Sequence, residues 1–575
     1  MRKLQLDAWS PLSYKRSLGD QQTPGTASYQ MPVWTGQHRR RLQAYQILQS
    51  YLSNSAREFQ PGEPEDHREY GDPVLLRDTI MDMVLGNEQT IDVDGADGYD
   101  PDKDSNDADA TAAWELQEWL RQAWVDEHGP LKLIEAERDA VGLGDAVYSL
   151  GWSSVKQRCR IRVWDPGFYF PVYNDENDDD YPERVHIAWE IEDDRDTVRQ
   201  QTSSRVTVRR LTWELVDLPD GETRSYPWND EPSTKTCLYT DATWQMDTSA
   251  RDVDDLQERN AVYAVGEDGE PISRVDVGYD FIPVVHVTNS VALKDGYGQS
   301  SLLMVMQVLD DLARGETQLA AAAETVANPQ LVLKKASLGN TRPGMSPGET
   351  WEVGDGDLSV LDTSRSLDAL TGRLAYLQDK LERNARTPAA ILGRVKPSDF
   401  PSGVALSMTF GPADRMVSKM RLVREPKYKI LLKFLWRINI AGDVQDIPQV
   451  WHDASVQFGS FMPADKQAVV QQVTQLRETN PPIISLETAI DMLRAVGIEV
   501  NEATDEIAAI TSMDFVGALA LYDATQDMSL VADYLQVKIE EPEPPVVVAP
   551  PNPDPTDPDA PPVDPNAPPV PPPPG

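Results

Sequence analysis

The residues best suited to chemistry in this chain are scattered histidines and clustered aspartates. No two of the six histidines have the i, i+4 spacing that lets two imidazoles on one helix share a zinc ion. Asp100, Asp102 and Asp104 match the first three ligand positions of an EF-hand loop. Ser105 and Thr111, however, stand where that loop needs glycine and a bidentate glutamate. We therefore predict no metal site and interpret the acidic runs as solvated loops.

No residue pattern typical of catalysis or cofactor binding is found. A phosphate-binding loop needs glycines followed by Lys-Ser or Lys-Thr, and a dinucleotide-binding loop needs a third spaced glycine; neither occurs. No Gly-x-Ser-x-Gly turn marks a nucleophile, and the only cysteines, Cys159 and Cys237, lie in no catalytic signature. His186 and His286 lie in apolar, strand-like runs and are predicted to be core histidines. The sequence predicts neither an enzyme nor a bound cofactor.

The acidity of the chain limits what it can bind. It holds 94 Asp and Glu against 53 Lys and Arg, a formal net charge of −41, and a surface of that sign repels nucleic-acid phosphates. Tight, sequence-reading DNA binding is therefore not expected. One stretch is basic, and a solvated helix face, ion pairs to a neighbouring subunit or non-specific phosphate contact would each account for it. Its residues are Arg415, Lys419, Arg421, Arg424, Lys427, Lys429, Lys433 and Arg437.

Length and composition indicate a soluble protein of several domains. The 575 residues allow three or four domains at roughly 150 residues each, and 40% of them are hydrophobic, as in ordinary globular proteins. Two cysteines cannot build a disulfide framework, which fits a reducing compartment. The start lacks the apolar stretch of a secretory signal, and no run approaches the ~18 apolar residues of a membrane span. We expect synthesis in the cytoplasm.

The positioning elements begin with helices and continue with strands. Apolar residues at three- and four-residue spacings predict helices over 37–53 and 78–85. After an acidic loop from Asp92 to Asp109, they predict two more over 112–141, separated at Gly129 and Pro130. Beyond Gly144 the period changes to two, which predicts an antiparallel sheet region. The predicted strands are 156–164, 168–173, 184–192, 205–216 and 237–246.

Two long helical patterns then flank a short β and loop excursion. The first covers 299–327, and the second, from Ser366, carries a narrow seam of leucines. A seam of this kind is not expected to be buried by one pair of helices, so neighbouring copies of the chain are its predicted partner. Substituting Leu374 or Leu377 by Asp is expected to impair assembly more than folding. The seam consists of Leu367, Leu370, Leu374, Leu377 and Leu381.

The last third of the chain is helical and then proline-rich. A helix is predicted over 402–440, interrupted at Gly411 and Pro412 and kinked at Pro426. Three further helices are predicted over 465–479, 485–496 and 513–536, with Ser485 as the N-cap of the second. The 17 prolines in residues 541–575 predict a disordered tail.

Several short segments appear in an order that is known from one protein family. They are Pro283–Asn289, Gly298–Ser300, Leu309–Asp311, Asn328–Leu333, Thr387 and Pro388 with Leu392 and Gly393, and Ser402–Leu406 before the basic stretch. Together they span about 160 residues. In this order they resemble the portal proteins of tailed double-stranded DNA bacteriophages.

The resemblance implies an α+β, portal-like fold of mixed helices and antiparallel sheet. Its parts would be a wing of helices and sheet (1–298), a first stem helix (299–329), a clip (330–364), a second stem helix (365–387), a tunnel loop (388–401), a long kinked helix with the wing return (402–460), a helical crown (461–540) and the disordered tail (541–575).

The resemblance also implies a structural function. Such proteins form a homo-oligomeric ring, usually a dodecamer, at the unique capsid vertex of the virion, after synthesis in the cytoplasm of the bacterial host. The ring is a conduit for double-stranded DNA during genome packaging and ejection. It docks the terminase and the head-tail connector proteins and meets the major capsid and scaffolding proteins, without a membrane. Arg394 and Lys396 in the tunnel loop would contact the DNA backbone non-specifically, and the leucine seam would serve oligomerisation.

Two other functions remain open from the residues alone. The acidic loops could hold divalent ions for a metal-dependent hydrolase or nuclease, although such a site needs rigid neighbours. Alternatively, the chain could be a monomeric scaffold or adaptor whose proline-rich tail recruits partners. Metal titration with a substrate would test the first alternative, and sedimentation would test the second.

Overall fold

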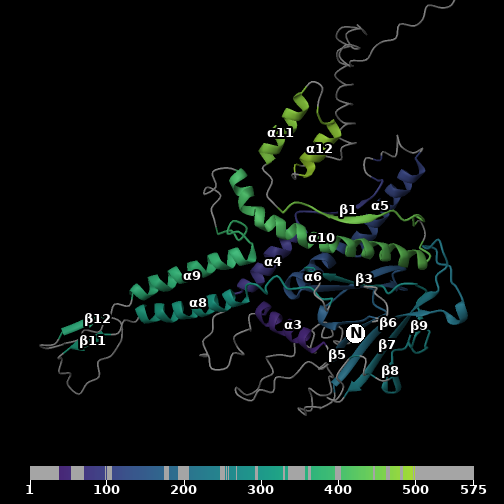
Figure 1. The fold of residues 1–575 in the computed structure, drawn as a ribbon, viewed down its shortest axis with the longest axis horizontal. Coiled ribbons are helices and arrows are strands. Elements are labelled where there is room, and N and C mark those ends of the chain that lie inside the picture. The colour runs from purple at the N-terminus through teal and green to yellow at the C-terminus, as the bar shows by residue number, and fades with distance from the viewer. Residues whose placement is uncertain are drawn as a thin grey trace, which may run out of the picture. The chain divides into compact units, whose positions relative to one another are not determined.

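Four helices from the first part of the chain pack beside antiparallel sheets (Figure 1). The computed structural model divides into two units, Met1–Pro463 and Ala464–Gly575. It describes residues 38–53, 70–96, 99, 107–173, 181–191, 206–246, 253, 256, 258–266, 268–291, 296–327, 331–334, 357–360, 364–394, 403–444, 447–461, 466–479, 483–495 and 498.

The four helices are α3 (Arg39–Leu52), α4 (Asp72–Leu85), α5 (Ala108–Asp126) and α6 (Gly129–Leu143). All four predicted helices are thus confirmed, and their apolar faces join one core. Helix α4 starts earlier than predicted because Pro73 fits the first turn of a helix, where an N–H has no partner to lose.

The predicted acidic loop is wrong at both of its ends. Asp92 lies in strand β1 (Gln89–Val93), and Asp109 lies in the first turn of α5. The side chain of Asp107 caps this helix, accepting hydrogen bonds from the N–H groups of Asp109 and Ala110 at 3.1 and 3.3 Å. Acidic side chains are favourable at a helix N-terminus, which explains why an aspartate run ends in a helix.

The largest sheet confirms the predicted antiparallel region. It joins β4 (Tyr169–Val172), β5 (Arg184–Ile191), β6 (Val206–Asp217), β7 (Lys235–Met246) and β8 (Val262–Tyr263), in that order. The short strand β9 (Val275–Asp276) also pairs with β7. Every pairing in it is antiparallel.

A second sheet contains a strand that the sequence did not predict. Its order is β10 (Val284–Thr288), β2 (Asp145–Ser153) and β3 (Arg158–Trp164). Strand β2 is buried on both faces from Asp145 to Leu150, so it lacks the alternation by which a half-buried strand is identified. A further two-stranded sheet pairs β1 with β13 (Ala454–Phe458), although these strands lie near opposite ends of the first unit's sequence.

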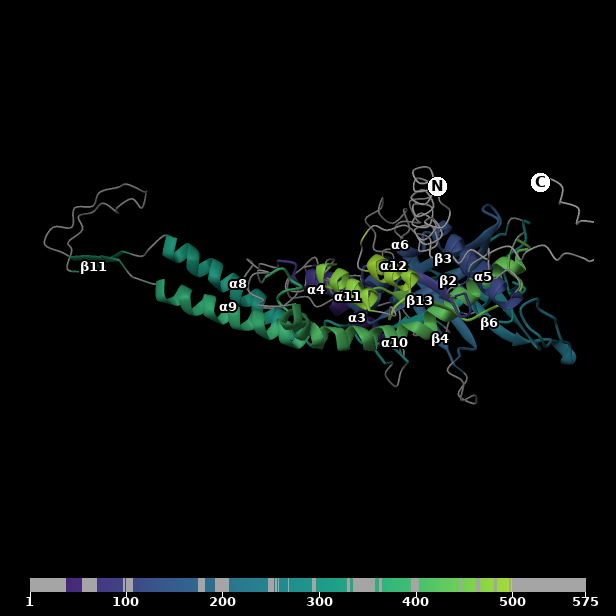
Figure 2. The same cartoon turned by 90° about the horizontal axis from the view of Figure 1, so that it is seen from above.

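Two long helices run side by side away from the sheets (Figures 1 and 2). Helix α8 (Met306–Ala327) is followed by strand β11 (Leu331–Lys334), and strand β12 (Asp357–Val360) precedes helix α9 (Ser364–Ala385). The two strands pair with each other. Two helices flanking a small β excursion are therefore confirmed. The first helix begins at Met306, because residues 301–305 form turns.

Helix α10 (Gly403–Ala441) is continuous over 39 residues and contains both Pro412 and Pro426. The predicted interruption at Gly411 and Pro412 is wrong. A proline inside a helix loses one hydrogen bond, but α10 packs on β2, β3, β10 and β13, and this burial maintains the helix.

The second unit contains α11 (Lys466–Glu478) and α12 (Leu486–Ala495), as predicted. Ser485 caps α12, its Oγ accepting a hydrogen bond from the Thr488 N–H at 3.0 Å. The predicted third helix and the proline-rich tail lie outside the described residues. The chain as described is a mixed α and β protein with antiparallel sheets, compatible with the α+β class. None of its described helices is both long and apolar enough to cross a bilayer.

Candidate functional site

The predicted leucine seam is partly buried within one chain. Leu374, Leu377 and Leu381 are 8, 7 and 9% exposed and belong to the same core as Leu309 and Leu312 of α8. The premise that this seam needs a neighbouring copy to bury it is therefore wrong for these three leucines. A role for the seam in oligomerisation stays a prediction.

Close approach of the two helices depends on Gly315 of α8. A Cβ atom at this position would lie 2.7 Å from Cδ2 of Leu374, so even alanine would displace the leucine. Leu367 and Leu370, nearer the start of α9, are only half-buried. The helix pair is thus packed tightly around Leu374 and more loosely toward β12.

Arg394 folds back onto α9. Its guanidinium forms an ion pair with Glu382 and donates a hydrogen bond to Gln378 Oε1 at 2.9 Å. The chain reverses just before it, at Arg386, whose φ of 57° is left-handed. Arg394 is 41% exposed and already shares its charge with a carboxylate, so any contact with DNA would compete with Glu382. Lys396 lies outside the described residues.

The chain before α8 is tied to the sheets and to α10 by one asparagine. Asn289, 3% exposed, donates its backbone N–H to Gly144 O at 2.8 Å, and its side-chain amide to Gln299 O and Ser301 Oγ at 2.8 and 3.0 Å. Its Oδ1 accepts from Arg424 of α10 at 2.9 Å. We call the cluster of Asp145, Asn289, Gly298, Arg424 and Glu137 the root junction.

Arg424 is fully buried and paired in this junction. Its Nε lies 2.8 Å from both carboxylate oxygens of Glu137 on α6, and Nη1 donates to Asn289 O at 3.2 Å and Met420 O at 3.0 Å. Tyr428, one turn further along α10, donates to Glu137 Oε1 at 2.5 Å. Burial lowers the pKa of Arg424, but the Glu137 charge and hydrogen bond more than reverse this and keep it above its ordinary value. A buried ion pair therefore fixes α10 to α6.

Asp145 forms the other half of the junction. It accepts hydrogen bonds from Tyr45 OH at 2.5 Å and from the Gly298 N–H at 2.8 Å, and lies 2.8 Å from His286 Nε2. Burial alone would raise the pKa of Asp145, but His286, Tyr45 and the Gly298 N–H hold it below its usual value. Gly298 must be glycine, because a Cβ there would lie 2.2 Å from Gly144 O.

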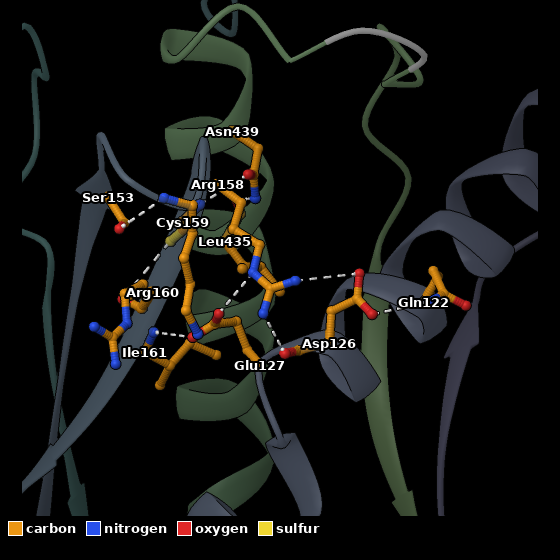
Figure 3. Close-up of polar contacts among 11 residues, drawn as sticks. Gln122, Asp126, Glu127, Ser153, Arg158, Cys159, Arg160, Ile161, Leu435 and Asn439 are labelled. Atoms are coloured by element: carbon orange, nitrogen blue, oxygen red, sulfur yellow. Dashed lines mark hydrogen bonds and ion pairs between the residues drawn. The ribbon is translucent and has the colours of Figure 1, made fainter.

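Helix α10 and the end of α5 also fix strand β3 from two sides (Figure 3). Glu127, 4% exposed, accepts hydrogen bonds from Arg158 Nε at 3.0 Å and from the Ile161 N–H at 3.2 Å. From α10, Asn439 Oδ1 accepts from the Cys159 N–H at 3.0 Å. Each buried oxygen satisfies a backbone or guanidinium donor, so the arrangement positions strands and contains no free acid for catalysis.

The basic stretch of α10 is not one solvated face. Arg421 donates to the carbonyls of Val84 and Gly459 at 2.9 and 2.8 Å, and Arg437 lies over the ring of Phe281 at 5.3 Å. Arg421, Arg424 and Arg437 are three of the eight basic residues in this stretch, and all three make contacts within the chain. Arg415 and Lys419 are exposed, whereas Lys429 pairs with Glu425 at 3.5 Å.

The remaining candidates for chemistry are structural in the described residues. His186 is 2% exposed and lies 2.8 Å from Thr212 Oγ1, so it is confirmed as a core histidine. The side chain of His286 is 11% exposed and is paired with Asp145, at the edge of the core. Burial raises the pKa of Cys237 to about 12, and that of Cys159 further, so neither thiol suits a nucleophile. Within the described part, no three His, Cys, Asp or Glu gather as metal ligands. The acidic runs at 100–104 and 175–180 lie outside it.

The root junction is what the sequence reasoning missed. It brings together two of the segments that carry the family resemblance, Pro283–Asn289 and Gly298–Ser300, with Asp145 and Glu137, which no sequence motif marked. Comparison with known proteins adds no assignment: no protein-family model matches the chain, and no curated protein does so.

Proposed function

We propose that this chain is the portal protein of a tailed bacteriophage: a homo-oligomeric ring at one capsid vertex that conducts double-stranded DNA and docks the terminase and the head-tail connector. The observation that carries the proposal is the arrangement of α8 and α9. These antiparallel helices bracket a two-stranded sheet and lie, in sequence, between a sheet-bearing region and the long helix α10. This is the order that the resemblance implies for stem, clip and wing.

The exposed surface of the helices supports assembly from identical copies. Tyr376 on α9 is 63% exposed, Met304 before α8 is 74% exposed, and on α10 Met408 and Leu422 are 77 and 69% exposed. Apolar side chains spread over several elements of one chain suit a contact in which one patch meets a different patch on the next copy. Such heterologous contacts close into a ring when the rotation between copies allows it.

The charge of the chain supports a conduit. With a net charge of −41, the subunits present a field that repels DNA phosphates, so a passing duplex would form only short-lived contacts. Arg394, which lies within the predicted tunnel loop and pairs with Glu382, would supply a local positive charge against this background.

Sedimentation velocity and electron microscopy of the full-length protein test the proposal. We expect closed rings with a central hole and a mass many times that of one 64.1 kDa chain. A particle that stays monomeric at high protein concentration, in both low and high salt, would refute it. ATP turnover by the purified protein that is lost on mutating one of its own residues would also contradict it, because the motor is expected to be a separate terminase.

A further inference from the structure

A pocket of about 460 Å³ opens on one face of the large sheet, and none of its described lining residues belongs to the root junction. Strand register places its floor on a single face, because His186 pairs with Thr212 and Thr212 with Thr240 across β5, β6 and β7. The described lining also includes Arg184, Arg210, Glu214, Trp244, Tyr263 and Arg274.

Among the described residues that line this pocket, the charged side chains are three arginines and one glutamate. Glu214 accepts a hydrogen bond from Arg184 Nη2 at 2.6 Å and lies 3.2 Å from Arg274 Nη1. Two guanidiniums therefore share one carboxylate. The third arginine, Arg210, donates to Val253 O at 2.7 Å. Each guanidinium has five N–H donors, so Glu214 orients Arg184 and Arg274 without using all of their donors. The described part of the lining is basic in a chain that is strongly acidic.

Arg274 is held in place by its own backbone. Its φ of 51° is left-handed, which is uncommon for a residue other than glycine, and its N–H donates to Thr240 Oγ1 at 3.0 Å. Such backbone conformations concentrate at binding sites, where the surrounding structure enforces them. The side chain is 51% exposed, so its guanidinium can meet a ligand from solvent.

The pocket also has an apolar, aromatic part. Trp244, Tyr263 and Leu256 line it, and the Arg210 guanidinium lies 4.7 Å from the centre of the Trp244 ring. Trp244 is only 3% exposed and is covered by this guanidinium, so the half-buried Tyr263 is the aromatic side chain that a ligand could reach. Arg184 and Arg274 together with Tyr263 fit a ligand with an anionic group and a flat apolar group. Its volume lies within the usual range for small-ligand sites, about 300–1,000 Å³.

We propose that this pocket binds a nucleoside monophosphate, with the phosphate on Arg184 and Arg274 and the base toward Tyr263. Guanidiniums bind phosphate through paired, charge-assisted hydrogen bonds. The net negative charge of the chain disfavours a polyanion, whereas a small dianion inside the pocket responds mainly to charges within the Debye length of about 8 Å. The site is independent of the ring proposal, since every lining residue comes from one chain.

Isothermal titration calorimetry of the full-length protein with AMP and with inorganic phosphate tests this site. We expect saturable binding of one AMP per chain and weaker binding of phosphate. Arg274→Ala and Arg184→Ala should each weaken AMP binding by about tenfold or more. Tyr263→Leu should weaken AMP binding but leave phosphate binding unchanged.

Arg121→Ala is the matched control. Arg121 on α5 is 42% exposed and pairs with Glu118 at 3.0 Å, like the pocket arginines, but lies outside the pocket. Its loss should leave AMP binding unchanged, and circular dichroism should show that each variant remains folded. Absence of saturable AMP binding to the wild type would overturn the proposal, as would unchanged binding in both pocket variants or equal weakening in the control.

Discussion

Arg424 lies on the buried stripe of α10, although it was grouped with a basic stretch. The residues of this stripe follow one another at three or four positions and are all at most 7% exposed: Ala413, Val417, Met420, Arg424, Tyr428, Leu431, Leu435 and Ile438. This spacing is visible in the sequence and could have separated Arg424 from its solvated neighbours. The partner could not be predicted in the same way, because Glu137 lies 287 residues earlier and only the tertiary fold brings it near.

Breaking the Arg424 and Glu137 pair should strongly destabilise the protein. In Glu137→Gln, the guanidinium stays buried without its counter-charge, which is expected to lower the free energy of unfolding by about 3–5 kcal/mol. Urea unfolding monitored by circular dichroism measures this.

The control for this variant lies on the same helix. Glu425→Gln breaks the exposed pair with Lys429, whose atoms are 3.5 Å apart, and should cost at most about 1 kcal/mol. Equal decreases in the free energy of unfolding of the two variants would contradict this prediction, because the buried pair would then contribute no more than the exposed one.

Asp165 should make stability depend on pH. Burial raises the pKa of Asp165 to about 7, although the hydrogen bond that its carboxylate accepts from the Gly167 N–H acts to lower it. In an unfolded chain, Asp has a pKa of about 3.9. Between these values the folded protein binds more protons than the unfolded chain, so this group favours folding at low pH. That advantage is lost as pH rises to about 7.

Asp165→Asn tests the sign of this effect. The free energy of unfolding of the variant, relative to wild type, should increase between pH 5 and pH 8, as measured by urea unfolding at both pH values. Asp230→Asn, at an exposed side chain in a bend of the chain, serves as the control and should show no such trend. A relative decrease for Asp165→Asn would contradict the assignment.

At the scale of elements, local patterns identified most helices but not their tertiary partners. The helical spacing of α3, α5, α6, α8 and α9 was sufficient because each is amphipathic. Pro412 misled the prediction for α10, since the cost of a proline, about 3 kcal/mol, is offset by burial of neighbours such as Ala413 and Val417, which are 0 and 2% exposed. Strand β2 was missed because burial on both faces removes the period on which prediction depends.

The helix pair α8 and α9 allows folding and assembly to be tested separately. Leu377→Ala removes a buried side chain and should reduce the stability of the pair by about 2–5 kcal/mol. Because this pair can open without global unfolding, hydrogen exchange of the α8 and α9 amides is the appropriate measurement. The earlier expectation for Leu374→Asp and Leu377→Asp changes accordingly: their first effect should be on folding of the pair.

The neighbouring Tyr376 provides the complementary variant. Its side chain is 63% exposed, so Tyr376→Asp should leave hydrogen exchange in α9 within about 0.5 kcal/mol of wild type. If the ring proposal is correct and this surface meets the next copy, the same variant should reduce assembly in sedimentation velocity. Normal rings from Tyr376→Asp would exclude this face from the contact.

At the scale of the whole molecule, the net charge of −41 opposes association of identical copies. Salt screens this repulsion, and the Debye length falls from about 30 Å at 0.01 M to about 8 Å at 0.15 M. Assembly should therefore increase when sodium chloride is raised from 10 to 300 mM, as measured by sedimentation velocity at fixed protein concentration. A decrease with salt would indicate that attraction between opposite charges, and not apolar contact, joins the copies.

The pairing of β1 with β13 sets an order of events during synthesis. Gln89 pairs with Phe458, so the first strand leaves the ribosome long before its partner exists. At translation rates of roughly 5–20 residues per second, the wait is roughly 20–70 s. Throughout that time the edge of β1 is open to the wrong neighbour, including the same strand of another nascent chain. A protein with this topology has reason to depend on chaperones while it is being made, whatever the stability of its finished form.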